Sequence, residues 1–337
     1  MKHLTLILLL LSTAPLFAGE EQKLSQAIEQ GLRRLETAAT NYTKNRQCFS
    51  CHHQSLPVMA MVSARAKGFK VDEEILKQQV AYSLKSLAPK VKEIAQGTSL
   101  GGGNTMAVYG LETLVLGGHA NDEVMVSLVK FLLARQKENG SWPPVTSRPP
   151  TEGSKFTTAF FALKNLRGYV FPKTDDAVAD EKIGKSLDQA RNTGIAWLEG
   201  AEPETTEDQV FHLRSLVLIE AKKERIEKAR SQLLGRQLAN GSWAQLLDME
   251  GDAYATGTVL VALKEAGVET NSKSFQNGIE FLLKTQESSG AWIVKTRSRP
   301  IQTYFDNGDP GGKSQFISTA ATGWAVLGLL ECVPTKK

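Results

Sequence analysis

The sequence predicts an all-α fold, an α/α toroid in the form of a six-fold α/α barrel built from about six helix-pair repeats. Two observations lead to this prediction: a short pattern recurs along the chain, and the helices that follow it are small and apolar on most sides. The chain has 337 residues, of which 41% are hydrophobic and 23% charged, which is enough apolar material for a large core. We expect a single toroid domain over residues 19–337.

The recurring pattern is a Gln, three residues, a Gly, one residue and a Trp. It occurs in FLLARQKENGSW, which ends at Trp142, in QLLGRQLANGSW, which ends at Trp243, and in FLLKTQESSGAW, which ends at Trp292. Two weaker copies are also present. GIAWLEG at 194–200 is similar to the GIEFLLK that begins the Trp292 copy, and GLRRLET at Gly31 is similar to another degenerate copy. We expect the helix to end at the Gln, the Gly to let the backbone leave it, and the Trp ring to cover the exposed turn.

A second set of helices is expected between these turns. Its six segments are rich in Ala, Thr, Gly and Met and recur about every 50 residues: HHQSLPVMAMV, GGGNTMAVYGL, EGSKFTTAFFAL, TEDQVFHLRSL, GDAYATGTVLVAL and SQFISTAATGWAVLGL. Small, apolar segments suit burial inside a ring of other helices. The more charged segments at 71–87 and 222–234 are expected outside. An open superhelical solenoid of helix pairs is the alternative, and we expect a closed ring.

The Gln, Gly, Trp pattern resembles the QW repeat of squalene and terpenoid cyclases and of protein prenyltransferase β subunits, which share an α/α toroid. More narrowly, CHHQSLPVMA, RPPTEGSKFT, DAYATG and QFISTAATGWA are similar to exported bacterial squalene-cyclase-repeat proteins that carry C-x-x-C-H near the N-terminus. The resemblance covers nearly all of the mature chain. It implies the fold and does not establish an activity.

The first residues indicate export. Lys2 and His3 precede the apolar run LTLILLLLSTAPLF, and Ala18 follows it, which predicts a signal peptide over residues 1–18. The run is shorter than the roughly 20 residues of a membrane span, so we expect a soluble periplasmic or secreted protein with no integral membrane segment after signal removal. The net charge of +4 has no basic block, which excludes a nucleic-acid footprint.

The catalytic groups of the resembling families are not evident. A class II terpenoid cyclase needs a protonated aspartate in a D-x-D-D run at the head of an inner helix. The nearest match is KTDDAVAD, with Asp175, Asp176 and Asp180, which we interpret as a solvated loop. The missing acid leaves open whether the protein is an enzyme.

The prenyltransferase zinc site is also incomplete. Those enzymes bind zinc through an Asp, a nearby Cys and a distant His. Here Asp252 takes the place of the Asp, but Tyr254 stands where the Cys should be and Gln315 where the His should be. Zinc is therefore disfavoured, and Asp252 is interpreted as the N-cap of its helix.

The segment QCFSCHHQ places Cys48, Cys51 and His52 at the head of the first inner helix. In an exported protein C-x-x-C-H is the attachment pattern of haem c, in which each thiol forms a thioether and the histidine ligates iron. The alternatives are a disulfide between Cys48 and Cys51, and a metal site of these residues with His52 or His53. Haem c at the barrel mouth is our leading prediction.

A haem would need a second axial ligand to work in electron transfer. His212, on the fourth inner helix, is the candidate from the opposite side of the ring, with a buried core histidine bonded to a carbonyl as the alternative. Met59 is a weaker candidate because it shares a helix with His52. We expect His119 to lie in a solvated loop. We expect Cys332 to be a buried or idle thiol, with intermolecular pairing as the alternative. Residues expected to line the cavity are His53, Gln54, Asn104, Met106, Asp252, Tyr254 and Gln315.

Three functions follow from these observations. The leading prediction is an exported toroid that carries haem c and acts in electron transfer or redox sensing, with a redox partner protein. The second is a terpenoid-cyclase-like or prenyltransferase-like enzyme acting on an isoprenoid or other small apolar ligand. The third is a non-catalytic toroid that binds a ligand or peptide, in which Cys48 and Cys51 form a disulfide or a metal site.

Overall fold

A computed structural model of the protein describes residues 14–300 and 303–334. Within these ranges the chain is helical, with one two-stranded sheet whose strands pair Trp243 with Asp252. Residues 1–13 of the predicted signal peptide lie outside the described residues, so its cleavage stays a prediction. The elements are α1 (Ala14–Asn45), η1 (Cys51–Ser55), α2 (Leu56–Ala66), α3 (Glu73–Leu87), η2 (Ala88–Lys90), α4 (Val91–Ala95), α5 (Gly103–Leu116), α6 (Glu123–Arg135), α7 (Lys155–Arg167), α8 (Ala177–Gly200), α9 (Thr206–Leu218), α10 (Lys223–Leu234), β1 (Trp243–Ala244), β2 (Gly251–Asp252), α11 (Ala253–Glu265), α12 (Lys273–Thr285), η3 (Gly312–Ser314) and α13 (Gln315–Leu330).

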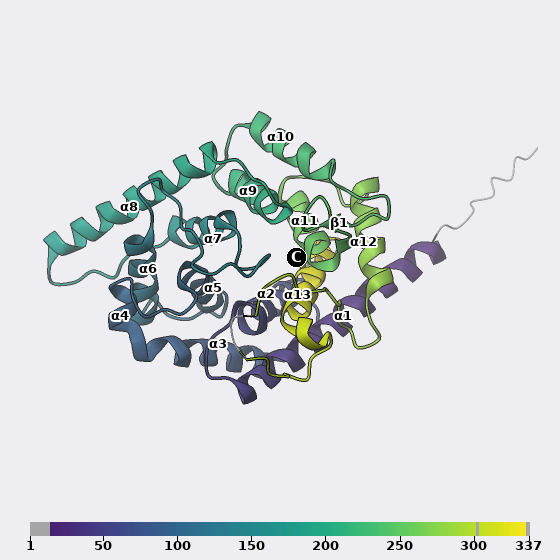
Figure 1. Cartoon of the computed structure of the whole chain (residues 1–337), viewed down its shortest axis with the longest axis horizontal. Helices are drawn as coiled ribbons and strands as arrows, with labels where there is room; N and C mark the ends of the chain where they lie inside the picture. The colour runs from purple at the N-terminus through teal and green to yellow at the C-terminus, as the bar shows by residue number, and fades with distance from the viewer. Residues whose placement is uncertain (1–13, 301–302, 335–337) are drawn as a thin grey trace, which may run out of the picture.

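The helices form a closed double ring. Figure 1 looks down this ring, with α2, α5, α7, α9, α11 and α13 inside and α1, α3, α4, α6, α8, α10 and α12 around them. The last inner helix, α13, packs against both α11 and α2, and the first outer helix, α1, packs against α12. The chain therefore closes on itself, which confirms the predicted toroid and excludes the open solenoid.

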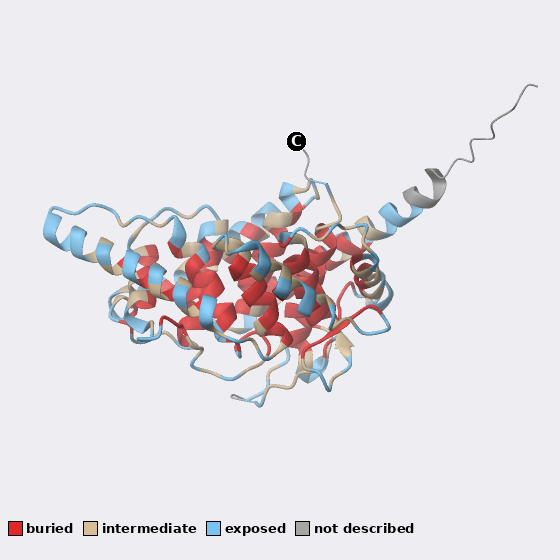
Figure 2. Cartoon of the chain, turned by 90° about the horizontal axis from the view of Figure 1, so that it is seen from above, coloured by how far each residue is buried: buried red, intermediate tan, exposed pale blue. Residues whose placement is uncertain are grey.

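The inner helices carry the core (Figure 2). Nearly every residue of α5, α11 and α13 is buried, whereas the outer helix α10 buries only Ala229 and Leu233. The largest fully buried side chains belong to aromatic residues, several of them on inner helices: Tyr109, Phe161, Phe211, Tyr254 and Trp324. Aromatic side chains therefore fill much of the space that the ring encloses.

The Gln, Gly, Trp pattern forms one hydrogen-bonded turn that joins neighbouring outer helices. Gln136 Nε2 donates to the carbonyl oxygen of Gly140 at 2.9 Å and to that of Ala190, in α8, also at 2.9 Å. Trp142 Nε1 donates to the Leu132 carbonyl at 2.8 Å. The amide of the Gln thus closes its own turn and at the same time holds the next outer helix.

The other two copies repeat these bonds. Gln237 reaches Ser274 in α12, and Gln286 reaches Ala27 in α1, so the last copy joins the two ends of the ring. The turn glycines have φ between +82° and +88°, which L side chains rarely adopt. The tryptophans are fully buried, and each indole N–H donates to a carbonyl at the end of the helix before its turn.

Each tryptophan ring also packs on the next outer helix, at a glycine. A Cβ at Gly194 would come within 2.7 Å of the Trp142 ring, and one at Gly31 within 3.2 Å of the Trp292 ring. This contact explains why GIAWLEG and GLRRLET are similar to the complete copies. Each supplies the glycine on which the tryptophan of the preceding unit of the ring packs.

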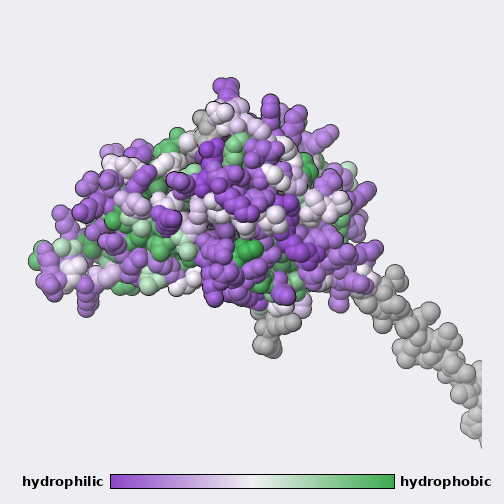
Figure 3. All heavy atoms as spheres, turned by 90° about the horizontal axis from the view of Figure 1, so that it is seen from below, coloured by the Kyte–Doolittle hydropathy of each residue, from purple (hydrophilic) through white to green (hydrophobic). Residues whose placement is uncertain are grey.

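The surface in the view of Figure 3 is mostly hydrophilic, and its hydrophobic side chains gather in small separate patches. Exposed large hydrophobic residues include Val145, Leu247 and Ile293, which lie in the three loops that follow the tryptophan turns. Among the described residues, no helix is both long and apolar enough to cross a bilayer.

The replacement Gln237→Ala should lower the free energy of unfolding by about 1–3 kcal/mol, because two backbone carbonyls lose their donor. Urea unfolding followed by circular dichroism measures this change. Gln232→Ala, at an exposed position of α10, the helix before this turn, is the matched control and should leave stability within about 0.5 kcal/mol of the original chain. Equal effects of the two replacements would contradict the role assigned to the turn.

Candidate functional site

The cysteine motif leads into the first inner helix and is divided between two environments. Cys51 opens η1, and the side chain of Ser50 caps this helix by accepting from the His53 amide at 3.2 Å. The Cys51 thiol is fully buried and donates to Glu152 Oε1 at 3.8 Å. Cys48 is exposed, and its sulfur lies 3.5 Å from the hydroxyl oxygen of Tyr42. Both thiols are free in the structure.

The two histidines that follow form a hydrogen-bonded chain with Asp309. His53 Nε2 lies 2.8 Å from Asp309 Oδ2, and His53 Nδ1 contacts His52 Nδ1. Arg34 Nη2 donates to Asp309 Oδ1 at 2.7 Å. Tyr42 stacks on the His53 ring at 4.9 Å between ring centroids. We call Asp309, His53 and His52 the histidine relay.

The relay fixes the tautomer of both rings. Burial lowers the pKa of His53 against the opposing effect of Asp309, so its ring is neutral at pH 7. The pKa of Asp309 is also lowered, because hydrogen bonds from His53 and Asn307 and the charge of Arg34 outweigh burial. His53 therefore donates from Nε2 to the carboxylate and accepts at Nδ1 from His52 Nδ1–H. This arrangement leaves His52 Nε2 as an unprotonated lone pair.

A second group of polar side chains meets inside the ring, and we call it the central cluster. Five of the six inner segments contribute to it, directly or through the loop before α7. Tyr254 OH lies 3.2 Å from Glu207 Oε1, and the pKa of Tyr109 is raised by burial first and then by Cys51 and Glu207. The members of the cluster are Cys51, Tyr109, Glu152, Thr157, Glu207 and Tyr254.

Glu207 is the acid of this cluster. Burial raises its pKa from 4.5 to about 8, so the carboxyl group is protonated at neutral pH. The hydroxyls of Thr157 and Tyr254 both donate to Oε1, at 2.9 and 3.2 Å. Since Oε1 accepts two hydrogen bonds, the acid proton belongs on Oε2, which is buried and has no hydrogen-bond partner.

The helix cap explains how Glu207 comes to point inward. Thr205 and Asp208 form a capping box at the start of α9, and Ser154 Oγ donates to Asp208 Oδ1 at 2.6 Å. These contacts join Asp208, in the first turn of α9, to Ser154, the N-cap of α7. Glu207, between the two capping residues, is therefore directed into the ring.

A loop closes the cluster from the mouth. Residues 143–153 precede α7, and in Figure 1 the loop before this helix runs into the middle of the ring. Arg148 pairs with Glu152 inside the loop, and Thr146 Oγ1 donates to Glu152 Oε2 at 2.7 Å. Ser298 Oγ donates to the Pro149 carbonyl at 2.9 Å, which joins this loop to the one before α13. We call residues 143–153 the plug.

The structure does not bring His212 to the cysteine motif. His212 Nε2 lies 3.1 Å from the carbonyl oxygen of Leu198 in outer helix α8, and its ring packs on Phe156. The imidazole therefore faces the outer wall, as in the alternative of a buried core histidine. Met59 and Met106 are buried within the ring.

The remaining residues predicted to line a cavity are structural in this conformation. Gln315 accepts from the Asn307 amide at 2.7 Å, which positions the loop that carries Asp309. Gln54 accepts from Ser50 at 2.9 Å, and Asn104 donates to the Pro143 carbonyl at 2.8 Å. Asp252 caps α11 by accepting from the Ala255 amide at 2.9 Å, which confirms its interpretation as an N-cap.

The acidic run and the zinc alternatives do not form a site. Asp176 caps α8 and Asp180, in the first turn of this helix, accepts from Thr174, both at the surface. The run is therefore solvated as expected, but its second half is helical and is not a loop. His119 bonds to Asp122 at 2.9 Å in an outer turn. Burial raises the pKa of the Cys332 thiol to about 11. Across residues 14–300 and 303–334, no three His, Cys, Asp or Glu side chains lie so as to hold a metal ion.

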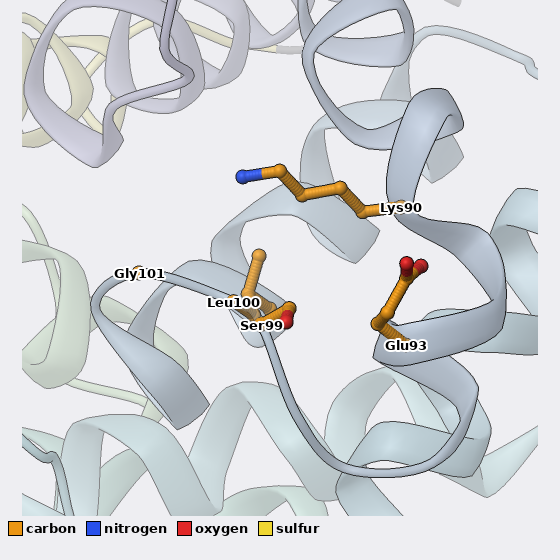
Figure 4. Close-up of a pocket in the computed structure, with 5 residues that line it drawn as sticks. All are labelled: Lys90, Glu93, Ser99, Leu100 and Gly101. Carbon is orange, nitrogen blue, oxygen red and sulfur yellow. The ribbon is translucent and has the colours of Figure 1, made fainter.

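Two hollows lie outside the central cluster. A surface pocket of about 400 Å³ is lined by Lys90, Glu93, Ser99, Leu100 and Gly101 on the outer wall (Figure 4). A cavity of about 10 Å³ lies between α1 and α13, beside Arg34 and Thr319, and is the size of a single water. Neither adjoins Glu207.

Sequence reasoning missed Glu207, Tyr109, Glu152 and Asp309. A glutamate in the first turn of a helix is an ordinary surface residue, and burial of Glu207 depends on the plug and on four other inner segments. One signal was present in the sequence: T-E-D at residues 206–208 puts an acid at the head of an inner helix, where the cyclase acid was sought.

Comparison with known proteins agrees with the fold. Residues 202–337 match the family model of the squalene-hopene cyclase C-terminal domain. Among solved structures, the type II terpene cyclase MstE from Scytonema has a TM-score of 0.59 at 14% identity, covering 94% of this chain and 100% of the cyclase. A variant of MstE in complex with geranylgeranyl dihydroxybenzoate has a TM-score of 0.58 at 12% identity, covering 95% and 100%.

A possible member of the GH105 family from Salmonella enterica has a TM-score of 0.54 at 12% identity, covering 92% of this chain and 93% of its own. The shared architecture is therefore that of an α/α toroid. The chain therefore has the α/α toroid fold of the terpene cyclases, and its C-terminal part is similar to the squalene-hopene cyclase C-terminal domain. Identities this low establish the fold and leave the activity to the residues of the site.

The stability of the protein should depend on pH through Glu207. Its pKa is about 8 in the folded chain against 4.5 as the ordinary value, so between these values the folded state holds a proton that the unfolded chain has released. The contribution of Glu207 to stability therefore falls as pH rises through this window, by up to about 1.4 kcal/mol per pH unit.

The variant Glu207→Gln removes this dependence, and its stability relative to the original chain should rise between pH 5 and pH 8. Urea unfolding at several pH values measures the difference. Glu204→Gln, at an exposed position of the loop just before α9, should keep the original pH dependence. Parallel pH profiles for the Glu207→Gln variant and the original chain would show that Glu207 is ionised in the folded state.

Proposed function

We propose that the protein is an isoprenoid-related enzyme of the terpene cyclase type, in which Glu207 protonates an alkene or a similar apolar substrate. The observation that carries the proposal is the protonated, buried carboxyl group of Glu207, whose Oε2 has no partner. Desolvation lets a carboxylic acid retain its proton at neutral pH, which a general acid that protonates carbon requires. The cyclase-like fold supports the same conclusion.

The reaction would begin with transfer of the Oε2 proton to one carbon of the double bond. The bond's electron pair forms the new C–H bond, the other carbon becomes a cation, and Glu207 becomes a carboxylate. Thr157 and Tyr254 already donate to Oε1, so they stabilise the carboxylate as it forms. Loss of a proton from the cyclised cation to a base ends the reaction.

Replacement of Glu207 tests the proposal. Purified protein is incubated with polyprenyl substrates that carry a terminal double bond or epoxide, and products are detected by gas chromatography with mass spectrometry. Glu207→Gln should reduce cyclised product at least about 100-fold, the usual contribution of a general acid. Activity of the original chain should fall as pH rises above about 8, where Glu207 loses its proton.

Glu204→Gln is the matched control and should retain full activity. Turnover that survives in the Glu207→Gln variant would refute the role of this acid. An absence of cyclised product from the original chain, in protein whose plug has been opened as described below, would refute the proposed reaction class.

Haem c is the second candidate, and one observation favours it. The histidine relay leaves the lone pair of His52 Nε2 free, which is the tautomer that a haem-ligating histidine requires. The thiols fit less well. Attachment needs both sulfurs at one porphyrin edge, whereas Cys51 is fully buried against Glu152 and Cys48 faces solvent. In this conformation the residues do not fit a haem, and electron transfer stays an alternative proposal.

A pyridine haemochrome spectrum decides between the candidates. The chain is expressed with and without a haem maturation system and its mass is measured. The isoprenoid proposal predicts a colourless protein of unmodified mass in both cases. A haemochrome band together with a mass increase of one haem would establish the alternative, and the Cys51→Ala variant should then lose the covalent attachment.

A further inference from the structure

We propose that Cys48 and Cys51 are a thiol–disulfide exchange site whose oxidation releases the plug from the barrel mouth. The inference deepens the proposed function by naming what controls access to Glu207. Only the role of the plug in controlling access to Glu207 rests on the proposed function. The thiol–disulfide exchange itself does not require that the protein convert an isoprenoid substrate.

The positions of the two thiols suit the two steps of disulfide exchange. Cys48 is exposed, so an external disulfide can reach it. Cys51 is three residues later, at the head of η1, and is fully buried. The structure therefore separates an accessible thiol, which meets the oxidant, from a protected thiol, which completes the reaction.

Glu152 supplies the base that the buried thiol needs. Burial raises the pKa of Cys51, and the charge of Glu152 raises it further, so Cys51 does not ionise on its own at neutral pH. Its S–H already donates to Glu152 Oε1 at 3.8 Å. The carboxylate can take this proton as the sulfur attacks, which removes the need for a free thiolate in an apolar site.

The oxidant is a dialkyl disulfide such as oxidised glutathione. The thiolate of Cys48 attacks one sulfur of the oxidant, forms a mixed disulfide and releases one thiolate, which takes a proton from water. The sulfur of Cys51 passes its proton to Glu152, attacks the Cys48 sulfur and releases the second thiolate, which takes that proton back from Glu152. The oxidant disulfide is reduced to two thiols, and Cys48 and Cys51 are oxidised to one disulfide.

The same step weakens the hold on the plug. A disulfide has no S–H, so Glu152 loses the hydrogen bond that anchors the plug to the first inner helix. Other contacts of the plug remain, including the hydrogen bonds from Ser298 to Pro149 and from Asn104 to Pro143 and the contact of Thr151 with Tyr254. Oxidation therefore favours an open mouth above Glu207.

Mass spectrometry and hydrogen exchange test the proposal on the full chain in a Cys332→Ser background. Oxidised glutathione should remove two hydrogens from the peptide that contains Cys48 and Cys51. Amide exchange over residues 143–153 should then become at least about 10-fold faster, because the plug opens more often, while exchange in α10 should not change. Dithiothreitol should reverse both effects.

Two variants separate the steps. Cys48→Ser, at an exposed position, should form no disulfide, and exchange in the plug should be the same with and without oxidant. Glu152→Gln should slow closure of the disulfide at least about 10-fold, so that glutathione accumulates on Cys48. Glu138→Gln, at an exposed position, is the matched control and should behave as the parent chain.

Two results would overturn the proposal. A parent chain that stops at the mixed disulfide on Cys48, with Cys51 still free, would show that the pair is not an exchange site. A disulfide that forms without any change in exchange over residues 143–153 would show that it does not control the plug. Neither readout uses an isoprenoid substrate, so failure here is distinct from failure of the proposed activity.

Discussion

The architecture depends on one interaction, the glutamine amide that bridges an outer helix to the next at three places in the ring. The amide of Gln286 bonds within its own turn and to Ala27 in α1, and so joins residues that are far apart in the chain. The bond is possible only because the glycine of the turn adopts a positive φ and has no Cβ. At Gly290 a Cβ would lie 2.4 Å from the Gln30 carbonyl oxygen. A closed ring follows when this local geometry is repeated at a constant angle.

This dependence explains how much of the fold could be predicted from the sequence. The turn uses three residue types at fixed spacing, so the six pairs and the segments 71–87 and 222–234 were assigned to the correct layers. The orientation of a single side chain was less accessible. His212 was placed on the correct inner helix, but its ring faces α8, since a shift of one or two residues around a helix reverses the direction of a side chain.

The candidate site was harder to predict because its chemistry arises from burial. Desolvation is the largest influence on Glu207 and is partly offset by its hydrogen bonds from Thr157 and Tyr254. These partners lie on α7 and α11, about 50 residues away on either side. A sequence shows that an acid is present at 207, but the sign and size of its pKa shift depend on which side chains the closed ring places around it.

The division of the cysteine motif connects the two parts of the site. His52 and His53 turn toward Asp309 and the loop before α13, whereas Cys51 turns inward to Glu152. The π-helical turn at Cys51–Ser55 permits this arrangement, because its extra residue changes the angular spacing of successive side chains. The first inner helix therefore contacts both loops of the mouth at once. A change at Cys51 would then act on the plug without disturbing the relay, since the contacts of His53 with Asp309 and of Arg34 with Asp309 do not involve the thiol.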